Sequence, residues 1–324
     1  MKVLIIKISS MGDIIHTLPA VTDASNIVPN ILFDWIVEET FSEILGWHPG
    51  IHQIIPINLR SWIKNWYKLS SWKKYSECCI QLKKKYDVII DAQGLLKTSL
   101  LVTYMTCGKK HGMDYISVRE SISSLFYHER HYSNKNQHAV ERIRQLFSLS
   151  LKYPVPSYIG KYNIEHLFPP QKHHAPYLIF FHSTTKFEKL WPELHWSIIA
   201  QFAIDAGYRI KLPFWTKSEE LRTHRLARLH CNQIIILPQL TLQEIAIQIS
   251  GATAVISVDT GLSHLTAALG CPNVTLYGPT NPKLIGTYGQ NQIVLRSATK
   301  KMKHLTPVHV WESFQKILNL KYIL

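Results

Sequence analysis

Short apolar runs alternate with segments of mixed polarity along most of the chain. In the first half these runs are rich in β-branched residues, and they occupy 2–8 (KVLIIKI), 32–37 (LFDWIV), 53–57 (QIIPI) and 87–91 (DVIID). Helix-compatible segments separate them, and this alternation is typical of right-handed βαβ units on a parallel sheet. We therefore expect the first half to be an α/β domain.

The same alternation restarts in the second half of the chain. It predicts further strands at 177–182, 208–214, 233–238, 254–259 and 273–278. A polar, proline-punctuated stretch from Pro154 to Pro176 lies between the two patterns and is typical of an interdomain linker. We predict two Rossmann-like domains, 1–160 and 175–303, with ligands at the carboxyl ends of the strands on either side of a central cleft. A helix over 307–322, with Val310, Phe314, Ile317 and Leu318 on one face, should pack back onto the body.

Composition narrows the class of protein. Of the 324 residues 46% are hydrophobic and 18% are charged, as in ordinary folded proteins. No apolar run reaches about 18 residues, and Lys7 interrupts the first one before any small-residue cleavage site, so we expect a cytoplasmic protein without a signal peptide. The five cysteines form no C-x-x-C pair and the histidines do not cluster, so no metal site is expected. The net charge of +14 favours anionic partners.

Two turns of the second half have the composition of anion-binding loops. SVDTGLSHLTAALG, 257–270, follows a strand and opens a helix at Thr260 and Gly261, so backbone N–H groups and hydroxyls can converge on a diphosphate. In the alternative interpretation Asp259 or Thr260 only caps that helix. HSTTKFEKLWPELHW, 182–196, places hydroxyls and then two lysines after another strand, which suits a phosphate clamp, or else a solvated loop.

Together these turns predict one nucleotide diphosphate in the second domain. The chain has no G-x-G-x-x-G and no G-x-x-x-x-G-K-[ST], which disfavours a dinucleotide dehydrogenase and a P-loop phosphotransferase. It also has no D-x-D, so Lys189 and helix N-termini are expected to neutralise the diphosphate in place of a metal.

Basic residues gather in the first half. Arg60, Lys64 and Lys68 follow one helical face while Trp62 and Trp66 lie on another, which suits a membrane surface or an anionic amphiphile. Nucleic acid and a plain amphipathic surface helix are the other interpretations. Further basic positions in the same half are Arg119, His138, Arg142 and Arg144.

Asp13 stands in the first strand-to-helix turn, where a carboxylate would repel phosphate. Such a turn collects free N–H groups and the positive end of a helix dipole. A carboxylate exposed there can serve as a general base, or it can be the N-cap of a helix that starts at Ile14.

Several segments together resemble the ADP-heptose-using glycosyltransferase family of lipopolysaccharide inner-core synthesis. They are KISSMGDIIHTLPA, DVIIDAQGLLKTSLL, KHGMD, HAVER, HSTTKFEKLWPELHW and SVDTGLSHLTAALGCPNVTLYGPT, spread over nearly the whole chain. The resemblance implies a GT-B fold whose C-terminal helix, 307–324, joins the first domain. It also implies inverting transfer of L-glycero-D-manno-heptose from ADP-heptose to the first Kdo of Kdo2-lipid A, without an obligatory metal or other cofactor, by a protein held peripherally on the cytoplasmic face of the inner membrane.

The resemblance also implies roles for individual residues. Asp13 matches the general base of the family. The donor-side positions are Thr184, Thr185, Lys189, Glu219, Leu240, Asp259, Thr260, Gly261 and His264, and Leu240 replaces a methionine beside the adenine. The acceptor-side positions are Arg60, Lys64 and Arg119, and we place His138 and Arg142 with them. Ser61 and Ile63 stand where the family has basic residues.

Two alternatives stay open at this point. One is a sibling of the same family that acts on the next heptose with the same donor and chemistry. The other is a non-catalytic basic protein that binds anionic lipid or nucleic acid, which would account for the net charge but not for the paired diphosphate turns.

Overall fold

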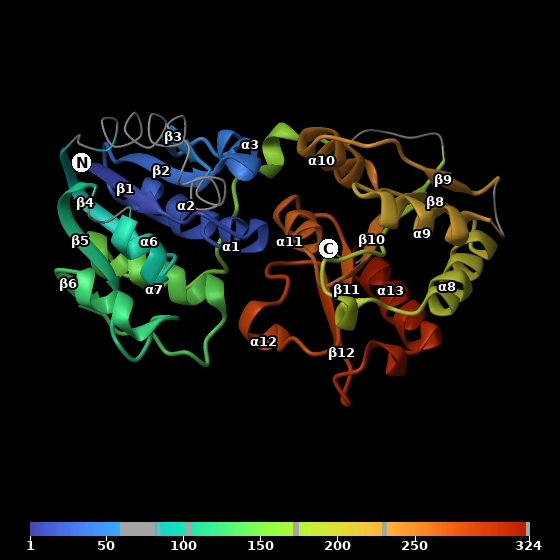
Figure 1. Ribbon diagram of the computed structural model, residues 1–324. Coiled ribbons are helices and arrows are strands. Elements are labelled where there is room, and N and C mark those ends of the chain that lie inside the picture. The colour runs from blue at the N-terminus through green and yellow to red at the C-terminus, as the bar shows by residue number, and fades with distance from the viewer. Residues whose placement is uncertain (59–81, 83–84, 102–104, 171–174, 229–231, 322–324) are drawn as a thin grey trace. The chain divides into compact units, whose positions relative to one another are not determined.

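The computed structural model describes residues 1–324 except 59–81, 83–84, 102–104, 171–174, 229–231 and 322–324 (Figure 1). The chain divides into two compact units, Met1–Asn163 and Ile164–Leu324. The division falls inside the proline-punctuated stretch that was predicted to be the linker.

The first unit is built on a six-stranded parallel sheet in the order β3-β2-β1-β4-β5-β6. Its strands are β1 (Lys2–Ile6), β2 (Leu32–Glu38), β3 (Ile51–Ile57), β4 (Lys85–Asp91), β5 (Cys107–Met113) and β6 (Glu129–His131). Its helices include α1 (Met11–Ile15), α2 (Leu18–Ile27), α3 (Ser42–Gly46), α6 (Leu96–Leu101) and α7 (Ala139–Leu151), with 3-10 turns η1 (Glu39–Phe41) and η2 (Ser121–Phe126).

The second unit repeats this plan with the order β12-β11-β10-β7-β8-β9. Its strands are β7 (Tyr177–Phe181), β8 (Arg209–Leu212), β9 (Ile234–Ile236), β10 (Ala254–Val258), β11 (Asn273–Tyr277) and β12 (Gln292–Arg296). Its helices are α8 (Glu193–Asp205), α9 (Lys217–Ala227), α10 (Leu242–Gly251), α11 (Gly261–Ala268), α12 (Pro282–Ile285) and α13 (Pro307–Lys321), with 3-10 turns η3 (Glu165–Leu167), η4 (Phe187–Lys189) and η5 (Met302–His304).

Both sheets therefore have the doubly wound Rossmann order, and the expected α/β class is confirmed. The direction of strand succession reverses between β1 and β4 in the first unit and between β7 and β10 in the second. In open α/β sheets ligands bind outside the carboxyl ends of the strands at that reversal. The turns after β1, β4, β7 and β10 are thus the places where the fold positions a site.

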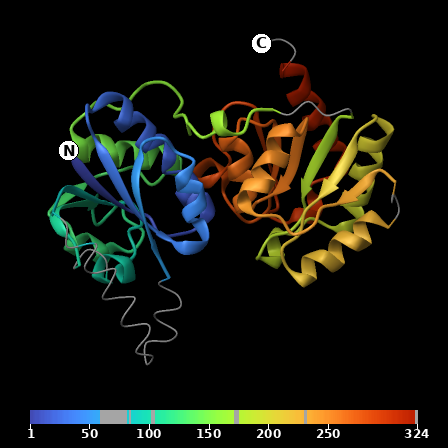
Figure 2. The same cartoon turned by 90° about the horizontal axis from the view of Figure 1, so that it is seen from above.

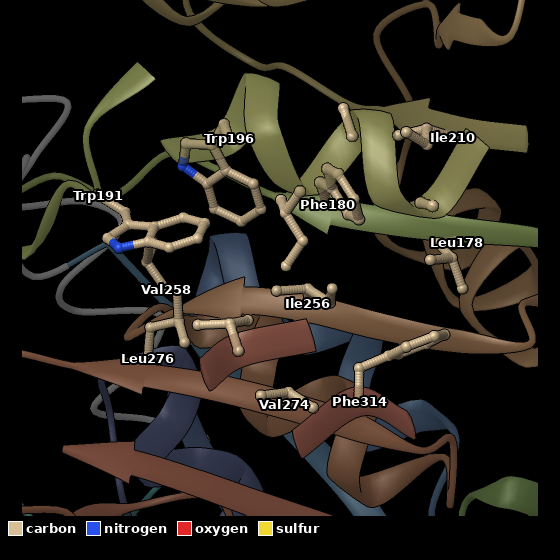
Figure 3. Close-up of a cluster of buried hydrophobic side chains, with 14 of the residues drawn as sticks. Leu178, Phe180, Trp191, Trp196, Ile210, Ile256, Val258, Val274, Leu276 and Phe314 are labelled. Atoms are coloured by element: carbon tan, nitrogen blue, oxygen red, sulfur yellow. The ribbon is translucent and has the colours of Figure 1, made fainter. Parts of the chain in front are cut away.

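The core of the second unit forms because its central strands are buried on both faces. Phe180 of β7 packs beside Trp196, Val258 of β10 lies below Trp191, and the two tryptophan rings meet edge to face at 5.0 Å between centroids (Figure 3). The Trp191 indole N–H donates to the Leu305 carbonyl at 2.9 Å, so this buried aromatic side chain also has its polar atom satisfied.

Helix α13 belongs to the second unit, so the expectation that it joins the first domain is wrong. Its residues Val310, Phe314 and Ile317 are buried in the core of the second unit. The helix packs against α8 and against β11 and β12, and Figure 2 shows it in dark red beside that sheet. The predicted apolar face was correct, and the hydrophobic surface of β11 and β12 is what it covers.

The pattern of apolar runs does not predict three of the strands. β5 and β6 contain Lys109, Lys110 and His111 among other polar residues, so no apolar run marks them. The third, β12, is a short edge strand. The expected strands at 208–214 and 233–238 are shorter in the structure, because loops with site residues begin inside those ranges.

Candidate functional site

The turn after β1 fixes the Asp13 carboxylate. The backbone N–H of Ser10 donates to Asp13 Oδ2 at 3.0 Å, and the Ser10 hydroxyl donates to the same oxygen at 2.9 Å. Asp13 is therefore the third residue of α1, in a capping box whose N-cap is Ser10. The alternative prediction of Asp13 as the N-cap of a helix from Ile14 is wrong, because the helix begins at Met11.

Lys7 is a buried cation beside this carboxylate. Its Nζ donates to the Ala92 carbonyl at 2.9 Å and lies 3.9 Å from Asp13 Oδ1. Gln93 Oε1 accepts from the backbone N–H groups of Ile8 and Ser9 at 2.9 and 3.2 Å. Because Ala92 and Gln93 follow β4, these bonds join the two turns on either side of the strand reversal.

The surroundings of Asp13 keep it ionised. Burial alone would raise the pKa of this carboxyl, but the Lys7 ammonium, the hydrogen bonds from Ser10 and the charge of Arg119 outweigh burial and lower the pKa below its usual value. The Asp13 side chain is 37% exposed, so a substrate can reach it. An ionised, accessible carboxylate can accept a proton.

Two of the remaining predicted acceptor residues, Arg119 and His138, lie near the same helix. Arg119 is exposed, and its charge acts on the Asp13 carboxyl. The His138 ring lies 5.3 Å from the ring of His16, the residue that ends α1. Arg142 instead donates through Nη2 to the Ser117 carbonyl at 2.5 Å, so its guanidinium supports the loop that carries Arg119.

Arg60 and Lys64, with the tryptophans that alternate with them, lie outside the described residues. Their predicted role in acceptor binding stays a prediction.

In the second unit, the turns after β7 and β10 meet. The Thr184 hydroxyl donates to the Asp259 carbonyl at 3.1 Å, and Lys189 Nζ lies 2.6 Å from Asp259 Oδ2. This ion pair is largely buried, with 17% of the Lys189 side chain and 8% of the Asp259 side chain exposed. Thr184 and Lys189 thus attach the two ends of this segment to the body, while residues 185–188 between them are exposed, as in the alternative of a solvated loop.

Helix α11 starts at this junction. Thr260 is its N-cap residue and Gly261 its first residue, while His264 is buried one turn further on. Within the described part of the chain the Thr260 side chain makes no capping hydrogen bond. The helix can therefore offer its first N–H groups to a bound anion.

A chain of hydrogen bonds starts at buried His182, next to this junction. Its Nδ1 lies 2.8 Å from the Ser183 hydroxyl, and its Nε2 lies 3.1 Å from the Thr223 hydroxyl. Because the Thr223 hydroxyl donates to the Glu219 carbonyl at 2.9 Å, Nε2 must carry the ring proton and Nδ1 must accept. Burial and the charge of Arg222 lower the pKa of His182 to about 3, so the ring is neutral.

Glu219 and Leu240 complete the same network. Glu219 Oε2 accepts from the backbone N–H groups of Trp215 and Thr216 at 2.9 and 3.0 Å, closing a capping box at the start of α9. The Trp215 indole donates to the Leu240 carbonyl at 3.0 Å. The structure therefore brings the predicted donor residues of four strand ends, β7 to β10, into one connected region.

Sequence reasoning missed three residues of these sites, namely Lys7, Gln93 and His182. A signal existed for Lys7, which is the one cation inside the apolar run VLIIKI and so had to find a buried partner. No sequence pattern pointed to Gln93 or to the orientation of His182, because their partners come from distant segments.

Among the residues that the structure describes, no group of three or more His, Cys, Asp or Glu side chains is arranged to hold a metal ion.

Two parallel six-stranded sheets of Rossmann order in one chain, in the arrangement of the heptosyltransferase structure that this chain matches, place it in the GT-B class of folds. Residues 79–313 match the model of glycosyltransferase family 9 (heptosyltransferase). The chain belongs to this family and is a glycosyltransferase.

Relatives named heptosyltransferase 1 cover nearly the whole chain. Lipopolysaccharide heptosyltransferase 1 of Escherichia coli K12 is 46% identical over 321 residues, covering 98% of this chain and 100% of that protein. The solved structure of E. coli heptosyltransferase WaaC with ADP is 45% identical, with a TM-score of 0.93 over 98% of this chain and 100% of that one. A second WaaC structure, with ADP-2-deoxy-2-fluoro heptose, is also 45% identical. Its TM-score is 0.90, and the match covers 98% of this chain and 99% of that one.

Sequence similarity to the sibling enzyme covers less of the chain. Lipopolysaccharide heptosyltransferase 2 of E. coli K12 is 32% identical over 115 residues, which is 34% of this chain and 33% of that protein.

Proposed function

We propose that this chain transfers L-glycero-D-manno-heptose from ADP-heptose to the first Kdo of Kdo2-lipid A, with inversion at the anomeric carbon. The near full-length similarity to lipopolysaccharide heptosyltransferase 1 supports the activity, and the WaaC structures with ADP and a fluorinated ADP-heptose support the donor. The observation that carries the proposal is an ionised carboxylate at the strand reversal of one unit together with a junction at that of the other, where Lys189 and the hydroxyl of Thr184 meet the start of a helix.

The donor diphosphate is held by the second unit in this proposal. Lys189 supplies positive charge, Thr184 and Thr185 supply hydroxyls, and the start of α11 supplies N–H groups. Glu219 Oε2 accepts two backbone N–H groups, and in this proposal Oε1 accepts from a ribose hydroxyl. Leu240 offers an apolar contact to adenine.

Asp13 acts as the general base. It takes the proton from the acceptor hydroxyl as that oxygen bonds to the anomeric carbon of heptose, and the bond from this carbon to the diphosphate oxygen breaks. The electron pair of the broken bond leaves with ADP. A single displacement of this kind inverts the anomeric carbon and needs one carboxylate on the side opposite the leaving group.

The charge on departing ADP is offset by Lys189 and the α11 N-terminus, so no obligatory metal is required. Activity should therefore persist in EDTA. Loss of turnover in EDTA, with recovery on adding a divalent ion, would contradict this part of the proposal.

We further infer a peripheral contact with the anionic cytoplasmic face of the inner membrane, where the lipid-linked acceptor resides. The net charge of +14 favours such a surface. No helix in the described ranges is long and apolar enough to cross a bilayer.

The sibling reaction on the next heptose remains the second candidate, and its support is the shared family model. Incubation with ADP-heptose and either Kdo2-lipid A or its heptosylated form, followed by mass spectrometry of the lipid, separates the two. We expect one added heptose on Kdo2-lipid A. Addition only to the heptosylated lipid would favour the sibling, and salt-sensitive DNA binding without any turnover would favour a nucleic-acid-binding protein.

A further inference from the structure

Large apolar side chains are exposed along one segment of the first unit. They are Tyr115 (62% exposed), Ile116 (68%), Ile122 (56%), Leu125 (65%) and Tyr132 (58%). We call these five residues the 115–132 patch. Single exposed apolar residues are ordinary, but several in one region of the surface mark an interaction site.

Hydrogen bonds hold the parts of this patch together. β5 and β6 are paired strands, so the turn after β5, with Tyr115 and Ile116, lies beside the end of β6, which precedes Tyr132. The Ser133 N–H donates to the Ser117 hydroxyl at 2.8 Å across these segments. Arg130 Nε donates to the Ser124 carbonyl at 3.0 Å and so ties η2, with Ile122 and Leu125, to β6.

The charges around the patch favour an anionic partner. Its acidic neighbours have partners within the protein: Asp114 accepts from the Ser117 N–H at 2.8 Å, Glu120 from the Leu96 N–H at 2.7 Å, and Glu129 pairs with Lys109 at 2.7 Å. Arg119 and Arg130 are exposed cations of the same segment, and Lys135 is an exposed cation that follows it. Their positive charge therefore faces solvent beside the apolar side chains.

The patch also adjoins the proposed base. Arg119 lies in the chain between Ile116 and Ile122, and it is close enough to Asp13 for its charge to act on that carboxylate. A surface beside Asp13 must accommodate whatever the acceptor hydroxyl is attached to.

We propose that the 115–132 patch docks the first unit on an anionic lipid bilayer. The aliphatic side chains enter the acyl boundary, the two tyrosines lie at headgroup depth, and Arg119, Arg130 and Lys135 contact lipid phosphates. The bilayer contact stands on the exposed patch itself. Its purpose, presenting a lipid-embedded acceptor to Asp13, rests on the proposed function.

The test uses the full chain with Ile116→Ser, Ile122→Ser and Leu125→Ser combined. The matched control combines Leu194→Ser, Leu221→Ser and Val308→Ser, three exposed apolar side chains of the second unit. Sedimentation with vesicles of phosphatidylethanolamine and phosphatidylglycerol measures binding, and thermal unfolding checks the fold. We expect the patch variant to lose about tenfold or more in vesicle affinity, and the control and both unfolding midpoints to stay near wild type.

Each other outcome overturns the docking surface. Unchanged vesicle binding by the patch variant, or an equal loss of binding in the control, would show that the 115–132 patch is not the surface that binds the bilayer. A wild-type oligomer that dissociates in the patch variant would assign the face to protein association. Vesicle binding needs no turnover, so a failure of heptose transfer would contradict the proposed function alone. If both hold, the variant should keep its turnover of deacylated acceptor and lose turnover of acceptor embedded in vesicles.

Discussion

Lys7 lies at the end of a strand whose neighbouring residues are apolar and fully buried. Its ammonium donates a hydrogen bond to the Ala92 carbonyl and stands 3.9 Å from Asp13 Oδ1. Opposite charge at that distance favours the ionised carboxylate. In the proposed mechanism Lys7 therefore helps to keep the pKa of Asp13 low, an electrostatic role that needs no contact with substrate.

Replacing Lys7 with Met should shift the pH profile of turnover. Methionine keeps an unbranched chain in the buried space and removes the charge, so the pKa of Asp13 should rise. A base works only when ionised, and activity is lost as pH falls through the folded-state pKa. The acid limb of kcat/KM against pH should therefore move to higher pH. Lys2→Met, at the other end of the same strand, is the control, and an equal shift there would refute the role of Lys7.

Lys189 is the residue-scale test of donor binding. A hydrogen bond to a charged group contributes roughly 1.5–3 kcal/mol, so Lys189→Ala should weaken ADP binding by about 10- to 150-fold in calorimetric titration. Lys217→Ala, an exposed lysine paired with Glu220, should leave the dissociation constant unchanged. An unaltered ADP affinity in Lys189→Ala would remove this lysine from the donor site.

At the scale of elements, the alternation of apolar runs predicted both parallel sheets. It did so because parallel strands are buried on both faces and read as continuous apolar runs. β5 could not be predicted in this way, since Lys109, Lys110 and His111 interrupt its pattern. The sequence predicted the apolar face of α13. Which sheet this face covers could not be predicted, because it depends on packing between segments far apart in the chain.

Phe314→Ala tests where α13 packs. Phe314 is buried in the core of the second unit, and removing a buried phenylalanine ring typically costs about 3–5 kcal/mol. Hydrogen exchange should accelerate at amides of β10 and β11 and remain unchanged in β1 and β4. Val308→Ala, on the exposed side of the helix, is the control. Faster exchange in β1 and β4 with protection kept in β10 and β11 would return the helix to the first domain.

At the scale of the whole molecule, each unit holds a buried histidine whose pKa is lowered. Burial and the nearby His131 and Lys109 lower the pKa of His111 to about 4, and burial and Arg222 lower that of His182 to about 3. Both rings are neutral in the folded protein at pH values where the unfolded chain, with a pKa of about 6.5, binds protons. These two histidines therefore do not lower the free energy of unfolding above about pH 6.5, and they lower it increasingly as pH falls from there toward their folded-state pKa values.

The free energy of unfolding should fall by up to about 1.4 kcal/mol per pH unit for each such histidine between roughly pH 6 and 4. His182→Gln keeps a neutral hydrogen-bond donor and acceptor. It should reduce the slope of the free energy of unfolding against pH by the contribution of one histidine, up to about 1.4 kcal/mol per pH unit. The exposed His166, changed to Gln, serves as the control. Urea titrations across this pH range give the slope, and a slope unaffected by His182→Gln would show that this ring does not contribute to it.

The site as a whole could be predicted only in its parts. The turns gave Thr184 and Asp259 from their residue types, yet the bonds that join them, and those that join His182 to Glu219 through Thr223, link segments tens of residues apart. The sequence singled out Asp13, because a carboxylate is unexpected in a turn of the kind that binds phosphate. Its ionisation depends on Lys7 and Arg119, which only the folded chain brings near it.

The central claim is that Asp13 takes the proton from the acceptor, and Asp13→Asn tests it most directly. The amide oxygen can still accept from Ser10, so the capping box and the fold should survive. General base catalysis typically contributes about 10²–10⁴ in rate. We predict that kcat for heptose transfer to Kdo2-lipid A falls by about that factor while the dissociation constant for ADP-heptose and the unfolding midpoint stay at wild-type values. A variant that folds normally, binds donor and retains near wild-type kcat would contradict the account.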